Sequence, residues 1–183
     1  TEIALIGKYV ELKDSYISIA ESLIHAGAEN KTRVNIHWIH SSEMEGENIK
    51  QQLSKMDGII VAPGFGSRAV EGKISAVKFA RENQVPFLGI CLGMQCAVIE
   101  FARNVIGFKE AHSTEINSDT SYPVISMMEE QKELKNLGGT MRLGAYDCHV
   151  EKDSLLHKMY ENDVISERNR HRYEFNNKYM KDF

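Results

Sequence analysis

Short apolar segments alternate with amphipathic segments along the first two-thirds of the chain. The apolar segments have the length of strands and are predicted at 3–7, 34–39, 58–62 and 86–90. Apolar residues at helical spacing between and after them predict helices at 17–24, 48–56, 72–82 and 92–103. Buried strands linked by helices are typical of a parallel sheet covered on both faces, so we expect an α/β fold.

Two of these helices carry more specific predictions. Asp14 or Ser15 is expected to cap the first helix. Its apolar residues at helical spacing are Ile17, Ala20, Leu23 and Ile24. The inward residues expected in the helix over 72–82 are Ile74, Val77 and Ala80.

The pattern changes past residue 110. Strands are expected at 122–125, 144–148 and 164–173, a short helix at 154–160, and a glycine-rich loop at 137–144. The sequence has no internal repeat and no linker-like segment, so we expect one domain over 1–183.

Composition narrows the class of protein. The 183 residues are 42% hydrophobic and 26% charged, the balance of a soluble globular protein. A net charge of −4 argues against a general nucleic-acid binder. No apolar run approaches the roughly 18 residues of a membrane span, and no signal segment opens the chain. Three cysteines are too few for a disulfide framework, which favours a cytoplasmic protein.

Cys91 lies in the strongest chemical motif, Gly89-Ile90-Cys91-Leu92-Gly93, between a predicted strand and a predicted helix. This is the cysteine form of the G-x-S-x-G nucleophile elbow. The helix start is expected to lower the pKa of the thiol, and the Leu92 N–H to stabilise an oxyanion. The alternative is an inert cysteine in a tight turn, as we expect for Cys96 in the core and Cys148 in a strand.

A second glycine-rich turn, 63–68, follows the third predicted strand. Gly64 there would let a backbone amide approach a substrate, which favours an oxyanion or ligand loop over a simple turn. The segment lacks the lysine and spacing of a P-loop, so phosphate binding is not expected. Both turns fall at the carboxyl ends of strands, where ligands bind in such sheets.

Four runs together resemble the glutaminase domain of CTP synthases, a class I glutamine amidotransferase. They are G-I-C-L-G-M-Q at 89–95, P-G-F-G-S-R-A-V-E-G at 63–72, G-G-T-M-R-L-G at 138–144 and E-R-N-R-H-R-Y-E-F-N-N at 167–177. The resemblance covers about residues 3 to 177. It implies a flavodoxin-like parallel sheet, mixed at its edge, with helices on both faces.

The resemblance also implies a reaction, the hydrolysis of L-glutamine to glutamate and ammonia. Cys91 matches the family nucleophile, and the oxyanion donors are matched by Gly64 and Leu92. The family's glutamine-binding positions are matched by Phe65, Gln95, Glu115 and Arg172. A carboxylate suits the ammonium of the substrate and a guanidinium suits its carboxylate. For Arg172 the alternative is a solvated strand face shared with Arg168 and Arg170.

Further implications concern regulation and partners. Thr140 and Arg142 match a lid that responds to GTP as activator; without the resemblance, 138–144 is a flexible loop. No cofactor is implied for this domain itself. The implied partner is a synthase domain of the same polypeptide, which uses ATP and magnesium to aminate UTP. The implied assembly is a cytoplasmic homotetramer, with no nucleic acid or membrane as partner.

The base of this family comes from a His-Pro-Glu run, and this sequence has none. Its three prolines follow Ala62, Val85 and Tyr122, and the seven histidines are expected in surface or packing positions. We therefore expect the base to lie past residue 183, the synthase domain to precede residue 1, and this stretch alone to be inactive. Asn169 stands where the family usually has histidine. The alternatives are a non-catalytic glutamine-binding module, or another class I amidotransferase or related cysteine hydrolase.

Overall fold

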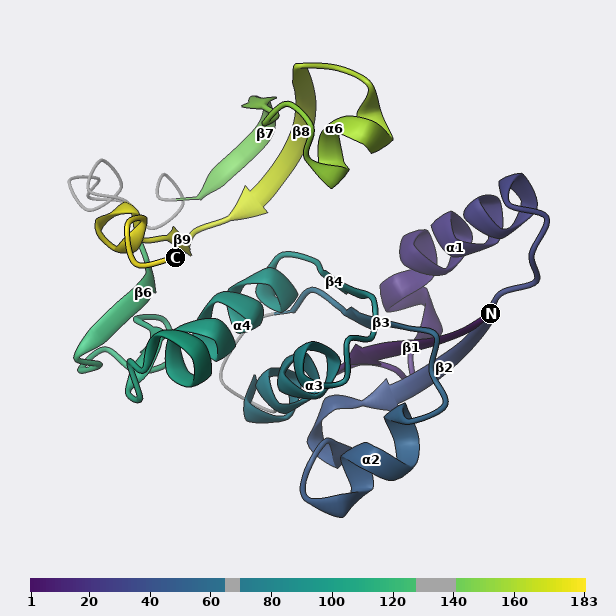
Figure 1. Cartoon of the computed structure of the whole chain (residues 1–183), viewed down its shortest axis with the longest axis horizontal. Helices are drawn as coiled ribbons and strands as arrows, with labels where there is room; N and C mark the ends of the chain where they lie inside the picture. The colour runs from purple at the N-terminus through teal and green to yellow at the C-terminus, as the bar shows by residue number, and fades with distance from the viewer. Residues whose placement is uncertain (65–69, 128–140) are drawn as a thin grey trace. The chain divides into compact units, whose positions relative to one another are not determined.

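The computed structural model describes residues 1–64, 70–127 and 141–183 (Figure 1). The chain divides into two compact units. Unit 1 comprises Thr1–Ser126 and Phe175–Phe183, and unit 2 comprises Met127–Glu174. Each unit is described by itself.

A parallel four-stranded sheet forms the centre of unit 1. Its strands are β1 (Glu2–Gly7), β2 (Asn35–His40), β3 (Gly58–Val61) and β4 (Phe87–Gly89), in the order β2-β1-β3-β4. All neighbouring pairs are parallel. The predicted α/β fold with a parallel sheet is therefore confirmed.

Helices cover both faces of this sheet (Figure 1). They are α1 (Ile17–Glu29), α2 (Glu47–Leu53), α3 (Val70–Glu82) and α4 (Leu92–Phe101), with short turns η1 (Lys13–Tyr16), η2 (Ser41–Glu43) and the π-helical η3 (Ala102–Ile106). Side chains alternate along a strand. Leu5 thus packs in the cluster that receives Ile19 and Leu23 of α1, while its buried neighbours Ala4 and Ile6 point to the opposite face.

The start and the inner face of α1 differ from the prediction. Asp14 and Ser15 lie in η1, and α1 begins at Ile17 without a side-chain cap. Ile17 and Ile24 are 55% and 54% exposed, whereas Ile19 and Leu23 pack against the sheet. Leu23 is thus partly buried as part of the predicted stripe, whereas Ile19 takes the inward position that was predicted for Ile17 and Ile24. In α3 the predicted inward residues, Ile74, Val77 and Ala80, are all buried, as expected.

A second sheet in unit 1 has the order β5-β6-β9. Its strands are β5 (Ala111–Ser113), β6 (Tyr122–Ser126) and β9 (Glu174–Phe175), and η5 (Asn177–Tyr179) follows. The carboxylate of Glu71 on α3 accepts hydrogen bonds from Arg103 on η3. His112 on β5 and Arg103 together lower the pKa of Glu71 to about 2. This cluster ties β5 to the helices that follow both glycine-rich turns.

Unit 2 contains an antiparallel pair, β7 (Arg142–His149) and β8 (Val164–His171), with α6 (Leu155–Tyr160) between them in sequence. Ser154 caps α6, accepting a hydrogen bond from the His157 N–H at 3.0 Å. The strand β7 begins at Arg142, two residues before the predicted start. Residues 142–144 are therefore strand rather than loop.

No helix in the described ranges is both long and apolar enough to cross a membrane.

Candidate active site

Cys91 occupies the turn between β4 and α4, and the backbone there has a rare conformation. The residue is the N-cap of α4 with φ +54° and ψ −109°. A positive φ is uncommon for a residue with a side chain and is found at functional turns. Adjacent parallel strands end at one edge of a sheet, and β3 pairs with β4. The turn with Cys91 and the turn with Gly64 therefore lie at the same edge.

The two glycines of the elbow have no room for a side chain. A Cβ on Gly93 would lie 2.1 Å from the Val61 carbonyl oxygen, and one on Gly89 would lie 2.6 Å from the Gly93 carbonyl carbon. The Ile90 N–H also donates to the Val61 oxygen, at 3.0 Å. The close approach of α4 to β3 thus explains the glycine at 93, and the close approach of the first turn of α4 to the end of β4 explains the glycine at 89.

The thiol of Cys91 is half-buried, and this burial raises its pKa. The Leu92 N–H donates a hydrogen bond to the sulfur and Lys73 contributes positive charge, both of which lower the pKa, while the charge of Glu115 raises it. The net direction is upward. The Leu92 N–H at the helix start lowers the pKa, as predicted, but desolvation of the sulfur outweighs this effect, so the predicted net lowering is wrong. The resting thiol keeps its proton and needs a base to become a nucleophile.

Gly64 and Leu92, the two predicted oxyanion donors, lie close together. A Cβ built on Gly64 would stand 3.6 Å from Cδ2 of Leu92 and 3.4 Å from Nζ of Lys73. The Leu92 amide belongs to the first turn of α4, where N–H groups have no partner within the helix. The structure brings both residues to the turn with Cys91. Their role as oxyanion donors stays a prediction.

Lys73 is the residue of this site that the sequence reasoning missed. It lies on α3, is 2% exposed, and donates a hydrogen bond to the Ala62 carbonyl at 2.8 Å. The signal that could have found it is its spacing. Lys73 stands three residues after buried Val70 and four before buried Val77, on the apolar stripe of the helix.

Two of the predicted glutamine-binding residues lie in unit 1. Gln95 is on the first turn of α4, is 5% exposed, and donates its N–H to the Cys91 carbonyl at 3.1 Å. Glu115 follows β5, and its N–H is bonded to Oγ of Ser113 at 3.2 Å. Its side chain is exposed, and its charge acts on Cys91. The structure therefore gathers one acid and one amide around the nucleophile.

The remaining predicted residues lie outside the described part of unit 1. Phe65 and Thr140 lie outside the described residues. Arg172 is half-buried in unit 2, directly after β8. Arg142 forms an ion pair with Glu174 at 3.0 Å and its guanidinium stacks 4.1 Å from the Tyr146 ring centroid, both within unit 2. The roles predicted for these residues in glutamine binding and in a lid stay predictions.

Five of the described histidines form hydrogen bonds with residues other than Cys91. Hydrogen-bonded pairs in unit 1 are His37 with Glu2, His40 with Ser42 and His112 with Ser113. In unit 2 the pairs are His157 with Asp163 and His171 with Asn169. Among the described residues of unit 1, no histidine contributes to the electrostatics of Cys91.

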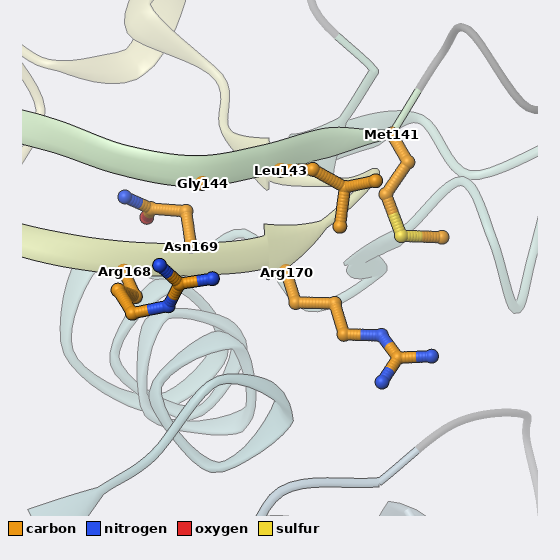
Figure 2. Close-up of a pocket in the computed structure, with 6 residues that line it drawn as sticks. All are labelled: Met141, Leu143, Gly144, Arg168, Asn169 and Arg170. Atoms are coloured by element: carbon orange, nitrogen blue, oxygen red, sulfur yellow. The ribbon is translucent and has the colours of Figure 1, made fainter.

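Unit 2 has a hollow of its own, of about 800 Å³, beside β7 and β8. Its lining residues are Met141, Leu143, Gly144, Arg168, Asn169 and Arg170 (Figure 2). Figure 2 shows Arg168 and Arg170 extending from one side of β8, as predicted for a charged strand face. Neither Cys91 nor Glu115 lines this hollow, so the chemistry argued above does not depend on it.

Comparisons with known proteins agree with this arrangement. Residues 11–183 match the family described as Glutamine amidotransferase class-I. A CTP synthase from Cytophaga hutchinsonii is 62% identical over 181 residues, covering 99% of this chain and 34% of the relative. A CTP synthase from Clostridium beijerinckii is 56% identical over 180 residues, covering 98% of this chain and 34% of the relative. The chain thus spans about a third of the length of these relatives.

A solved structure is similar over the whole chain. It is the Trypanosoma brucei CTPS glutaminase domain with bound acivicin, which matches with a TM-score of 0.90 and 40% identity. The match covers 100% of this chain and 70% of that one.

Proposed function

The chain belongs to the class I glutamine amidotransferases, as a glutaminase domain of the CTP synthase kind, and on that basis we propose that it hydrolyses L-glutamine through a thioester on Cys91. The observation that carries this proposal is Cys91 itself, held at positive φ on a strand-to-helix turn beside Gly64 and the Leu92 amide. The relative that binds acivicin supports a small-molecule site in this fold.

The chemistry proceeds by acyl transfer. Once a base removes the proton of Cys91, the sulfur attacks the side-chain carbonyl carbon of glutamine and forms a tetrahedral oxyanion. The amides near Gly64 and Leu92 would stabilise that charge. The C–N bond then breaks, the nitrogen takes a proton and leaves as ammonia, and the acyl group remains on sulfur. Water hydrolyses the thioester, giving glutamate and the free thiol.

Specificity would come from groups that bind the α-ammonium and the α-carboxylate of the substrate. Glu115 would attract the ammonium of glutamine, and the effect of its charge on Cys91 supports this role. Gln95, buried on the first turn of α4, would contact the same substrate. We assign the carboxylate of glutamine to Arg172, whose planar fork can bind both oxygens.

The longer protein would use the ammonia in a second reaction. We propose that a synthase domain of the same polypeptide aminates UTP to CTP with ATP and magnesium, and that GTP activates the glutaminase. The relatives that carry the name CTP synthase and extend well beyond this chain support that assignment. A cytoplasmic homotetramer completes the proposal.

Protection from alkylation tests the glutamine site without requiring turnover. L-glutamine at ten times its dissociation constant should slow the reaction of Cys91 with iodoacetamide about tenfold, because the occupied site excludes the reagent. Cys148 is exposed on β7 and provides a control within the same chain, since its rate should not change. Peptide mass spectrometry measures both rates. A specific site would be contradicted if L-glutamine left the alkylation rates of both Cys91 and Cys148 unchanged. It would also be contradicted if D-glutamine protected Cys91 as well as L-glutamine does.

A further inference from the structure

A lysine is buried beside the glycine-rich turn of the proposed site. Lys73 is 2% exposed, and its ammonium donates to the carbonyl of Ala62, the residue that follows β3. Pro63 and Gly64 come next in the chain. The hydrogen bond of Lys73 therefore holds the start of the glycine-rich turn.

This burial is costly unless something compensates it, because an ammonium loses its hydration. Among the residues that the structure describes, no carboxylate contributes to the electrostatics of Lys73. Burial lowers its pKa and the charge of Lys8 lowers it further, whereas the groups that oppose this are the thiols of Cys96 and Cys91 in their charged forms. An apolar side chain of the same length would fill the space without the cost, so packing alone does not account for a lysine here.

Of the two thiols, Cys91 is the one that can use this charge. Cys96 is fully buried on α4, and burial raises its pKa to about 12, so it remains protonated. Cys91 is half-buried at the turn, and the charge of Lys73 acts against the burial that disfavours its thiolate. Nζ would also lie 3.4 Å from a Cβ on Gly64, which places it directly under the proposed oxyanion loop.

We propose that Lys73 is a positioning residue of this site: its ammonium fixes the Ala62–Gly64 turn and stabilises the thiolate of Cys91 by its charge. The inference rests on the proposed function for its purpose. The interaction between the Lys73 ammonium and the Cys91 thiolate can be tested without glutamine. Lys73 does not touch the substrate in this account. It makes the deprotonated sulfur less costly to form and keeps the backbone amide of the turn in place.

The test is the pH dependence of Cys91 alkylation by iodoacetamide in the chain with Lys73→Met. Met fills the same unbranched volume without charge. Because the thiolate is the reacting form, we expect alkylation at pH 7.5 to slow about tenfold and the midpoint of the pH profile to rise. Lys78→Met is the matched control. Lys78 lies on the same helix with its side chain 48% exposed, and its loss should change neither quantity.

Two further variants separate charge from structure. Lys73→Arg keeps the charge and should keep the profile of the parent, whereas Lys73→Gln keeps a donor without charge and should behave as Lys73→Met does. Circular dichroism establishes which variants are folded. Parental alkylation in a folded Lys73→Met or Lys73→Gln chain, or an equal slowing in Lys78→Met, would overturn the proposal. Loss of the fold in all three Lys73 variants would also overturn it, because Lys73 would then be a structural residue. None of these readouts depends on whether glutamine is the substrate.

Discussion

Glutamate release by the purified chain is expected to be about a hundredfold to ten-thousandfold slower than that of an intact class I amidotransferase, which is the loss that follows removal of a general base. Burial raises the pKa of Cys91, so the resting thiol is protonated at neutral pH. No histidine in the described part of unit 1 acts on it. The sequence contains no His-Pro-Glu run, because its three prolines follow Ala62, Val85 and Tyr122. Within the described part of unit 1, Cys91 thus has no histidine that could take its proton.

A coupled assay for glutamate measures this rate, with Cys91→Ala as the background. Turnover comparable with an intact enzyme, and abolished in Cys91→Ala, would contradict the expectation and indicate an internal histidine as base. Alanine variants of the seven histidines, tested one at a time, would then identify it. The Cys91→Ala rate also separates catalysis from spontaneous hydrolysis of glutamine.

The substitution Gly93→Ala is expected to destabilise the chain by about 3 kcal/mol or more, although alanine normally favours a helix over glycine by about 1 kcal/mol. The new Cβ would lie 2.1 Å from the Val61 carbonyl oxygen and 2.9 Å from its carbonyl carbon. Both atoms belong to the backbone of β3, in the middle of unit 1, and cannot rotate away. The clash must separate α4 from the sheet, so it outweighs the gain in helix propensity.

Gly64→Ala is the matched control for this prediction. Its Cβ would meet Nζ of Lys73 at 3.4 Å and Cδ2 of Leu92 at 3.6 Å, which is ordinary contact with side chains that can adjust. The expected loss is within about 1 kcal/mol. Urea unfolding followed by circular dichroism gives both values. A Gly93→Ala chain as stable as Gly64→Ala would contradict the close approach of α4 to β3.

The fold was largely predictable because the local patterns agree with one another. The apolar strands and the helix face with Ile74, Val77 and Ala80 have to be buried, and a parallel sheet covered by helices buries both. The structure has that architecture. The three-residue strand β5 was missed because so short a segment has no readable period. In α1 apolar residues occur at several helical spacings, and the sequence alone does not show that Ile19 and Leu23, rather than Ile17 and Ile24, pack against the sheet.

The site was predictable in its glycines and its nucleophile, but not in its electrostatics. Gly89 and Gly93 are glycines for steric reasons, and such a requirement can be recognised in a linear motif. The direction of the Cys91 pKa depends on how much water the fold removes from the sulfur, which no motif contains. Lys73 was missed for a related reason. A lysine in an amphipathic helix is ordinarily solvated, and its burial against Ala62 is a tertiary property.

The central claim, that Cys91 is the nucleophile of a glutamine site, is tested most directly by labelling with a chloroketone analogue of glutamine. Intact-protein mass spectrometry should show one adduct per chain, and peptide mapping should place it on Cys91. L-glutamine should prevent its formation, and the Cys91→Ala chain should not form it. No adduct in a folded chain, or an adduct that appears on the exposed Cys148 at the same rate as on Cys91, would contradict the account.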